Sequence, residues 1–377
     1  MAIETVGLVL FGLGVLTAGA ELLVRGASRL ATAVGISPLV IGLTVVAYGT
    51  SAPEMAVSAK ASLAHQPDIA LGNVLGSNIF NVLFILGVSA LIRSLAVDRQ
   101  LVRLDVPIMI GVSALVWLMA LDGQISRAEG LLLCAGIVLY NAFLIRLSRR
   151  KSVAPQGAEG AGDGPRSALR RKGAALALAF VLVGLGLLTV GARWLVRGAV
   201  GLAAALGVSE LVIAVTVVAA GTSLPELATS VVATIHRQRD IAVGNIVGSN
   251  IFNALAVLGV AGVVSPAGLS VAPGALRLEM PVMLAAAAAC LPVFFTGGRI
   301  ARWEGFVFLA YYLAYLACLI SQPLYPGSFG AVRTAVLWVI TPLMLVVVLA
   351  PLVPRRVSSR RARPGKTGRG TRRRERA

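Results

Sequence analysis

Two copies of one six-residue motif each place a carboxylate inside a long apolar segment. They read Gly49-Thr50-Ser51-Ala52-Pro53-Glu54 and, 172 residues later, Gly221-Thr222-Ser223-Leu224-Pro225-Glu226. On a helix, two hydroxyls that lie four and three residues before a glutamate share its face. A carboxylate at membrane depth is costly and by default indicates an ion pathway or an ion site. The paired motifs therefore predict a cation site built from two glutamates.

Each motif also contains a proline that a regular helix cannot accommodate. Pro53 lacks the N–H that would donate to the carbonyl of Gly49, and Pro225 stands in the same relation to Gly221. We therefore expect both helices to break at the motif. Broken backbone inside a membrane is tolerated where it is buried or lines a watery cavity, and its freed carbonyls suit a cation.

The apolar segment after each motif carries a polar residue at every fourth position. These residues are Asn73, Ser77 and Asn81 in the first copy and Asn245, Ser249 and Asn253 in the second. The spacing of four places each set on one side of its helix. For Asn73 and Asn245, ion binding and hydrogen bonding between helices are equally good interpretations. The interspersed glycines indicate close helix packing; they are Gly72, Gly76, Gly244 and Gly248.

Only oxygen donors gather in these patterns, a set that favours Ca²⁺ over Mg²⁺ or a transition metal. Two carboxylates supply about two negative charges, which one Ca²⁺ or two Na⁺ neutralise, so the two ions should compete for overlapping sites. The histidines, His65 and His236, lie at the ends of apolar segments and are not expected to join the site. The structural alternative is that the glutamates are protonated or paired. Glu21 exemplifies that alternative, because it lies one turn before Arg25 and should form a local ion pair.

The composition is that of an integral membrane protein. Hydrophobic residues make up 57% of the 377 residues and the mean hydropathy is +0.87, well above a soluble globular protein. Apolar stretches long enough to cross a bilayer as helices recur along the chain. We expect eleven spans, at residues 6–24, 36–60, 69–92, 104–121, 128–147, 173–192, 208–235, 241–264, 278–296, 303–321 and 331–352.

The two halves of the chain repeat each other. Between residues 68–88 and 240–260, fifteen of twenty-one residues are identical. Because each copy has an odd number of spans, the second must enter the membrane from the opposite side. The expected fold is an all-α integral membrane protein with two inverted five-helix repeats and one extra C-terminal helix. Its parts are the first repeat (1–147), a cytoplasmic linker (148–172), the second repeat (173–321), the extra helix (322–354) and a basic disordered tail (355–377).

The net charge of +18 is concentrated in two places. Eleven of the 34 Lys and Arg follow residue 354, and eight lie between Arg146 and Lys172. With the N-terminus outside and the C-terminus in the cytoplasm of a cell (inner) membrane, twenty-eight of them face the cytoplasm and six face out, as the positive-inside rule requires. The tail therefore serves topology, with contact to anionic lipid head groups as a secondary role. No nucleic-acid partner is expected, and the sequence does not indicate an oligomeric state.

Enzyme chemistry is not indicated. The Gly-Thr-Ser strings resemble half of a nucleophile elbow, but proline stands where its second glycine belongs. There is neither a His-Glu-x-x-His motif nor a Walker-type glycine loop in the sequence. We expect no enzymatic activity, no ATP hydrolysis and no cofactor, since the ions would be substrates.

The paired Gly-Thr-Ser-x-Pro-Glu motifs, each followed by Gly-Asn-x-x-Gly-Ser-Asn-Ile-Phe-Asn, resemble the two alpha repeats of the cation/calcium antiporter superfamily in its sodium/calcium exchanger branch. The resemblance implies ten helices in two inverted halves, with broken helices around a central group of ion sites. It implies that spans one and six slide across the rest as a gate, for which Gly7, Gly12, Gly14 and Gly19 would provide a smooth surface. The implied ion ligands are Glu54, Glu226, the hydroxyls of Thr50, Ser51, Ser77, Thr222, Ser223 and Ser249, the carbonyls of Ala47 and Ala219, and the amides of Asn81 and Asn253.

Two features of the motifs bear on the counter-ion. Members that co-transport potassium carry an acid where this chain has Asn253 or Asn81, so potassium is not expected. Proton/calcium members tend to carry Gly-Asn-x-x-Glu in place of the present motif, which favours sodium. The resemblance thus implies an antiporter that exchanges Na⁺ for Ca²⁺ by alternating access. An H⁺/Ca²⁺ exchanger is the alternative, and a cation-selective channel is a further one.

Overall fold

The fold was analysed in a computed structural model that describes residues 2–151, 165–208, 213, 216–217 and 219–350. Nine helices of this part are long and apolar enough to cross a membrane, and the bent pair Pro38–Thr50 and Ala52–Leu63, which meet at 46°, forms a tenth crossing. Each of the eleven expected spans coincides with one of these or, for residues 208–235, with the shorter apolar helix Leu224–Ile235. Most of residues 209–218 lie outside the described residues. The chain is therefore an all-helical integral membrane protein.

The first half runs from one long helix into a series of shorter, broken ones. Its elements are α1 (Ala2–Val34), α2 (Pro38–Ile41), η1 (Gly42–Val46), α3 (Ala47–Thr50), α4 (Ala52–Leu63), α5 (Pro67–Ile79), η2 (Phe80–Leu86), α6 (Gly87–Ile92), β1 (Leu95–Ala96), η3 (Leu101–Asp105), α7 (Val106–Met119), η4 (Ala120–Asp122), β2 (Gln124–Ile125) and α8 (Arg127–Lys151).

The second half repeats this order and then adds helices. Its elements are α9 (Pro165–Ala205), α11 (Ala219–Gly221), α12 (Leu224–Ile235), α13 (Arg239–Phe252), η6 (Asn253–Val257), α14 (Leu258–Val264), β3 (Leu269–Ser270), η7 (Ala275–Glu279), α15 (Met280–Phe295), η8 (Thr296–Gly298), β4 (Arg299–Ile300), α16 (Arg302–Leu324), α17 (Pro326–Ala335), η9 (Val336–Ile340) and α18 (Thr341–Leu349).

Three π-helical turns, η3, η7 and η9, follow from prolines. Each ends two residues before a proline, at Pro107, Pro281 or Pro342. A proline cannot donate the hydrogen bond to the carbonyl four residues earlier. The preceding turn therefore widens locally while the helix continues.

Two short antiparallel ribbons join the halves. In one, β1 pairs with β4 through Leu95 and Ile300, and in the other, β2 pairs with β3 through Ile125 and Leu269. Each ribbon takes one strand from each half, so loops 205 and 144 residues apart in sequence are fixed against one another. The two ribbons repeat one arrangement, as the internal repeat predicts.

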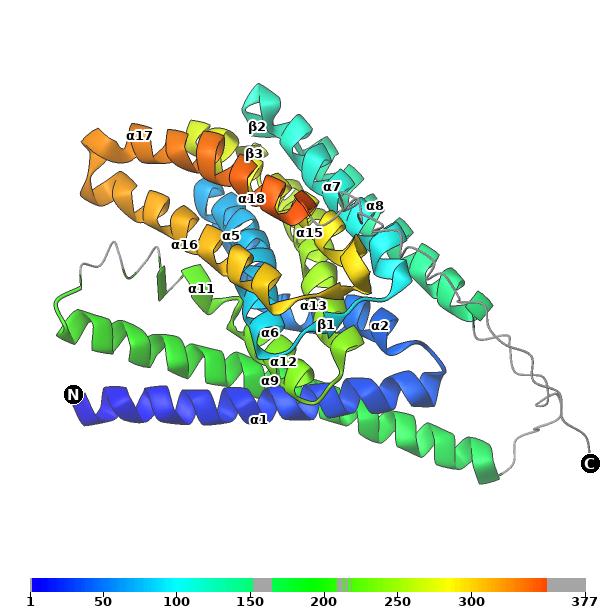
Figure 1. Cartoon of the computed structure of the whole chain (residues 1–377). Coiled ribbons are helices and arrows are strands. Elements are labelled where there is room, and N and C mark those ends of the chain that lie inside the picture. Colours follow the sequence, from blue (N-terminus) through cyan, green and yellow to red (C-terminus); the bar gives the residue numbers. More distant parts are fainter. Residues whose placement is uncertain (1, 152–164, 209–212, 214–215, 218, 351–377) are drawn as a thin grey trace, which may run out of the picture.

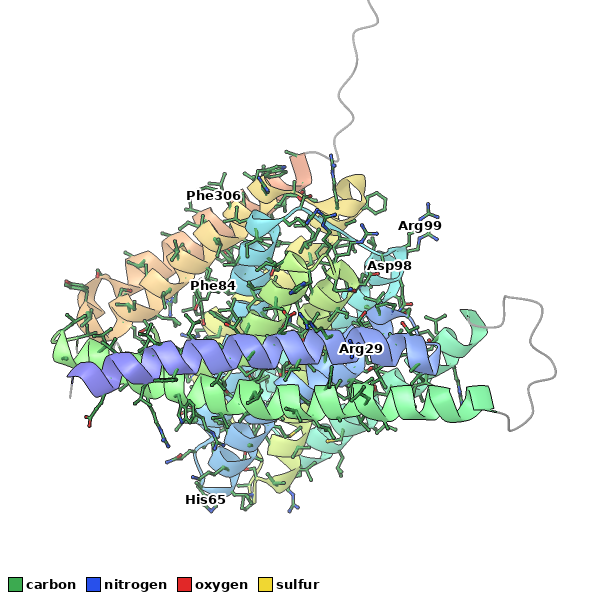
Figure 2. The ribbon with its side chains drawn as sticks, turned by 90° about the horizontal axis from the view of Figure 1, so that it is seen from below. Arg29, His65, Phe84, Asp98, Arg99 and Phe306 are labelled. Carbon is green, nitrogen blue, oxygen red and sulfur yellow. The ribbon has the colours of Figure 1, made fainter. Side chains whose placement is uncertain are left out.

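Helices α1 and α9 lie side by side along one flank of the molecule and cross the other helices (Figures 1 and 2). Glycines let their backbones touch: a Cβ on Gly12 would lie 2.5 Å from the Leu195 nitrogen, and one on Gly191 would lie 2.5 Å from the Leu16 nitrogen. Gly19 and Gly184 meet in the same way one heptad along. The pairing of early residues of α1 with late residues of α9 shows that the two helices are antiparallel.

The four glycines of span one divide into two pairs, while their role in sliding stays a prediction. Gly12 and Gly19 belong to the close contact with α9, but a Cβ on Gly7 or Gly14 would meet nothing within 4 Å. The physical reason is the helical period of 3.6 residues, because Gly7 and Gly14 are offset from Gly12 by five and two residues and so lie on other faces of the helix.

The most buried spans are the two that carry the polar residues. In Pro67–Ile92 and Arg239–Val264, 72% and 83% of an apolar 18-residue stretch is buried, against 28% of such a stretch in Glu4–Val34. Gly244 and Gly248 of α13 approach the backbone of Leu39 and Leu43, at 3.0 and 2.6 Å from an added Cβ, so the packing interpretation holds for these two. A Cβ on Gly72 or Gly76 would meet nothing within 4 Å among the described residues. The repeat partners of α2 and η1, residues 210–218, lie largely outside that part of the chain.

The segments outside the repeats differ in part from expectation. The predicted linker, residues 148–172, is shortened at both ends, because α8 continues to Lys151 and α9 begins at Pro165. Proline suits a first helical turn, where its missing N–H would have no partner. The extra helix is formed by α17, η9 and α18, with α18 against α15. The predicted disordered tail, 355–377, lies outside the described residues.

Candidate functional site

Both motif helices break where the prolines predict. Ser51 separates α3 from α4 with φ −84° and ψ 9°, and Ser223 precedes α12 with φ −90° and ψ 8°. Glu54 and Glu226 lie in the first turn of α4 and α12. Unpaired N–H groups give this end of a helix a partial positive charge that favours a carboxylate. The break therefore places each glutamate at a helix end that stabilises its negative charge.

The two motifs meet through reciprocal hydrogen bonds. The Ser51 hydroxyl donates to Glu226 Oε1 at 2.8 Å, and the Ser223 hydroxyl donates to Glu54 Oε1 at 3.0 Å. All four side chains are at most 1% exposed. Each glutamate is thus held by the serine of the opposite half, and the two acids face one buried region.

The threonines of the motifs also cross between halves. Thr50 Oγ1 donates to Asn245 Oδ1 at 3.2 Å, and Thr222 Oγ1 donates to Asn73 Oδ1 at 3.2 Å. Asn73 and Asn245 therefore form the hydrogen bonds between helices that one of their two interpretations predicts.

The remaining expected ligands line the same region. Ser77 Oγ lies 3.0 Å from Ser223 Oγ and 3.5 Å from Glu54 Oε1. Several buried polar atoms have no hydrogen-bond partner in the described part of the chain: Oε2 of Glu54 and Glu226, Oγ of Ser249, and both amide atoms of Asn81 and Asn253. Buried polar atoms are rarely left unpaired, and such a group calls for an ion or water. Asn81 and Asn253 each lie in a π-helical turn, η2 and η6, a distortion common at functional sites.

The two expected carbonyl ligands differ. Ala47 O accepts the Ser51 N–H at 3.0 Å, so it is not freed by the break, and the Thr50 hydroxyl lies 3.3 Å from the same oxygen. In the second half, the Ser223 N–H donates to Ala220 O at 3.2 Å, one residue beyond Ala219. The two halves are therefore not identical at this position.

Sequence reasoning missed two serines that complete the site. Ser58 and Ser230 accept hydrogen bonds from the Asn73 and Asn245 amides at 2.9 and 3.0 Å. Each serine lies one turn after a motif glutamate and repeats at the same offset of 172 residues. That repetition was the available signal.

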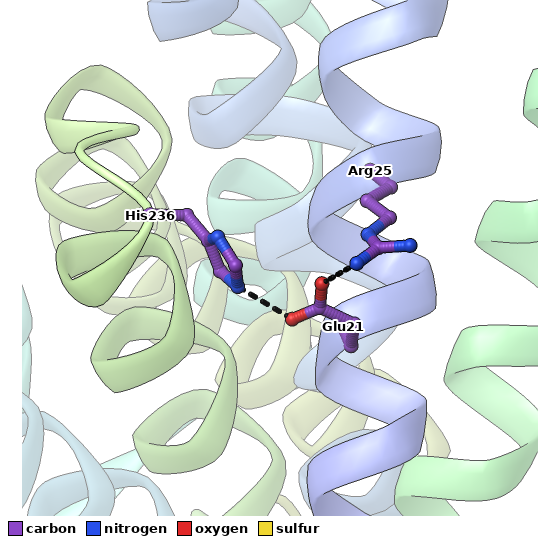
Figure 3. Close-up of polar contacts among 3 residues, drawn as sticks. All are labelled: Glu21, Arg25 and His236. Atoms are coloured by element: carbon purple, nitrogen blue, oxygen red, sulfur yellow. Dashed lines mark hydrogen bonds and ion pairs between the residues drawn. The ribbon is translucent and has the colours of Figure 1, made fainter.

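Glu21 forms the expected ion pair with Arg25, at 2.5 Å. Its second oxygen lies 2.7 Å from His236 Nε2 (Figure 3). Since His236 follows α12, this contact connects α1 to the helix that carries Glu226. His65, by contrast, is exposed at the periphery of the molecule (Figure 2). Neither histidine contacts the paired glutamates.

A cavity of about 320 Å³ reaches the site from one side. Pro53 and Val57 of α4, Arg193 and Arg197 of α9, and Thr222 line it. Thr222 is the expected ligand among these lining residues.

An all-helical membrane fold with two repeated halves, broken helices and paired buried carboxylates defines a transporter of cations. The chain belongs to the sodium/calcium exchanger protein family, whose model matches residues 4–146 and 176–321. Members of this family are transporters and not enzymes, and Ca²⁺ and Na⁺ are their substrates.

Relatives and solved structures agree with this placement. The sodium/calcium exchanger MaX1 of Methanosarcina acetivorans is 33% identical over 83% of this chain and 97% of its own. The inner membrane protein YrbG of Escherichia coli strain K12 is 41% identical over 74% of this chain and 84% of its own. A solved structure of the sodium-calcium exchanger NCX_Mj, soaked with zero Na⁺ and Ca²⁺, matches with a TM-score of 0.72 and 32% identity over 85% of this chain and 100% of that chain.

Proposed function

We propose that this protein exchanges Na⁺ for Ca²⁺ at the region where the two motifs meet. The proposed ligands are Glu54, Glu226, the hydroxyls of Thr50, Ser51, Ser77, Thr222, Ser223 and Ser249, the carbonyls of Ala47 and Ala219, and the amides of Asn81 and Asn253. The observation that carries the proposal is the reciprocal pairing of the motifs, which leaves Oε2 of both glutamates buried without a partner in the described residues.

The charge of the site supports coupled exchange of the two ions over uncoupled movement of either ion. No described Lys, Arg or His forms an ion pair with Glu54 or Glu226. Moving two bare carboxylates through an occluded, low-dielectric state costs far more than moving a neutralised site. Only the form loaded with one Ca²⁺ or two Na⁺ should therefore reorient, which couples the two ions.

Sodium as the counter-ion is supported by the motif and by the name of the relative MaX1. Asn81 and Asn253 carry no charge, so the site has two carboxylates and needs no potassium.

We place the protein in the cell (inner) membrane with the N-terminus outside, the linker and C-terminus in the cytoplasm, and the repeats at residues 1–147 and 173–321. The positive-inside distribution and the name of the Escherichia coli relative support this placement.

The function is tested by counter-flow. Reconstituted protein should take up radioactive Ca²⁺ when an outward Na⁺ gradient is imposed in potassium-free medium. Glu54→Gln and Glu226→Gln should each abolish uptake, because a neutral amide in place of one carboxylate leaves the charge of a bound Ca²⁺ only half neutralised. Asp122→Asn is the matched control, since Asp122 is exposed at the end of η4, before β2. Uptake that ignores Na⁺ but follows an imposed pH gradient would falsify the sodium assignment, and single-channel currents without counter-transport would indicate a channel.

A further inference from the structure

Two asparagines outside the proposed ligand set connect the halves beside the site. Asn73 of α5 and Asn245 of α13 are repeat partners, and Asn245 is 0% exposed. Each side chain contacts its own half through its amide nitrogen and the opposite half through its amide oxygen.

The surroundings of Asn73 fix the direction of every hydrogen bond. Asn73 Nδ2 lies 3.2 Å from the backbone oxygen of Glu54 and 2.9 Å from Ser58 Oγ. A carbonyl oxygen can only accept, so the nitrogen must face Glu54. The Ser58 hydroxyl donates to Ala70 O at 3.2 Å, so its oxygen is free to accept from Asn73.

It follows that the oxygen of Asn73 faces Thr222. Since Asn73 Oδ1 has no hydrogen, the Thr222 hydroxyl must donate across the 3.2 Å between them. In this bond the single hydroxyl proton of Thr222 points to Asn73. Both lone pairs of the Thr222 oxygen remain for another partner.

The second half repeats this arrangement. Asn245 Nδ2 lies 3.0 Å from Ser230 Oγ and 3.5 Å from the backbone oxygen of Glu226, and Asn245 Oδ1 accepts from Thr50 at 3.2 Å. The Thr50 hydroxyl also lies 3.3 Å from Ala47 O. Both of its acceptors are protein oxygens, so here too the proton is held by the protein.

We infer that Asn73 and Asn245 are positioning residues for ion binding, each turning the threonine hydroxyl of the opposite half so that its lone pairs face the cation. The inference rests on the proposed role of Thr50 and Thr222 as ligands. A free hydroxyl rotates and can present either its hydrogen or its lone pairs, but a cation is bound only by the lone pairs. A hydroxyl already oriented by an asparagine pays no reorientation cost when the ion arrives.

A double-mutant cycle tests the inference through the KM for Ca²⁺ in Na⁺-driven uptake. Asn73→Leu and Thr222→Val should each raise this KM about tenfold with little change in maximal rate, the size expected for one lost polar contact. The double variant should be no worse than Thr222→Val alone, because without the hydroxyl there is nothing for Asn73 to orient. Thr222→Ser keeps the hydroxyl, so Asn73→Leu should still raise the KM about tenfold in the Thr222→Ser background. The cycle of Thr50→Val with Asn245→Leu should behave in the same way.

The chain supplies its own matched controls, since each asparagine pairs with only one threonine. Asn73→Leu combined with Thr50→Val, and Asn245→Leu combined with Thr222→Val, should multiply their separate effects on KM. If Asn73 served only to hold helices together, its effect on KM would persist in the Thr222→Val background, and that result would overturn the inference. A wild-type KM for Thr222→Val would instead count against the proposed ligand set. Where Asn73→Leu does not fold, Asn73→Ser replaces it in the cycle.

Discussion

The hydroxyl of Ser51 donates a hydrogen bond to Glu226 Oε1 at 2.8 Å, across 175 residues of sequence. Its repeat partner Ser223 donates to Glu54 at 3.0 Å. In these two hydrogen bonds, neither carboxylate accepts from the serine of its own motif. Each half thus supplies the serine that bonds the glutamate of the other half, and neither half alone contains both partners of such a bond.

Removing one of these serines should weaken ion binding. In Ser51→Ala, Glu226 Oε1 loses a charge-assisted hydrogen bond, a contact that contributes about 1.5–3 kcal/mol. We expect the KM for Ca²⁺ to rise at least tenfold, since about 1.4 kcal/mol corresponds to tenfold. The measurement is the rate of Na⁺-driven Ca²⁺ uptake against Ca²⁺ concentration. Ser113→Ala is the control, because that buried hydroxyl bonds only its own helix, at Met109 O; an equal effect of the two variants would contradict the assignment.

The contact between α1 and α9 should tolerate no side chain at its glycines. A Cβ on Gly19 would lie 2.7 Å from the Leu188 nitrogen, and forced overpacking typically costs about 1–3 kcal/mol. We expect Gly19→Ala to lower the thermal unfolding temperature in detergent. Gly14→Ala, on the same helix but with open space around it, should leave stability unchanged or raise it by up to about 1 kcal/mol. Equal Tm values for the two variants would show that the close contact is absent.

The bond between Glu21 and His236 should restrain movement of α1 along α12. If α1 slides during transport, as the family resemblance implies, this 2.7 Å contact must break in each cycle. An exposed ion pair contributes about 0.2–1 kcal/mol, so His236→Ala should raise the maximal rate by up to about fivefold with an unchanged KM for Ca²⁺. His65→Asn is the control, because asparagine tolerates the positive φ of 56° found at His65. A maximal rate no higher than wild type would argue against a restraining role.

The proposed orientation can be read from cysteine accessibility. Asp122 lies at the end of η4, just before β2, and Arg299 lies in β4 of the other ribbon; both are exposed. With the N-terminus outside, Asp122→Cys should react with a membrane-impermeant maleimide in intact cells, whereas Arg299→Cys should react only after permeabilisation. The native protein, whose Cys290 and Cys318 are buried, provides the background. Labelling of Arg299→Cys in intact cells would reverse the assignment.

The sequence by itself determined the elements and the chemistry of the site. The repeat offset paired Glu54 with Glu226, the prolines marked where both helices break, and the polar residues at every fourth position identified the buried face of α5 and α13. These features are local, because periodicity and proline geometry act within one helix.

Only the tertiary structure decided which residues meet. The sequence gives no reason for Ser51 to bond Glu226 rather than Glu54, for Asn73 to bond Thr222, or for Gly12 to contact α9 while Gly7 does not. Such partners depend on how helices separated by more than a hundred residues pack and rotate against each other. A helical face shows which side chains point the same way, but the opposing face that completes each hydrogen bond exists only in the folded chain.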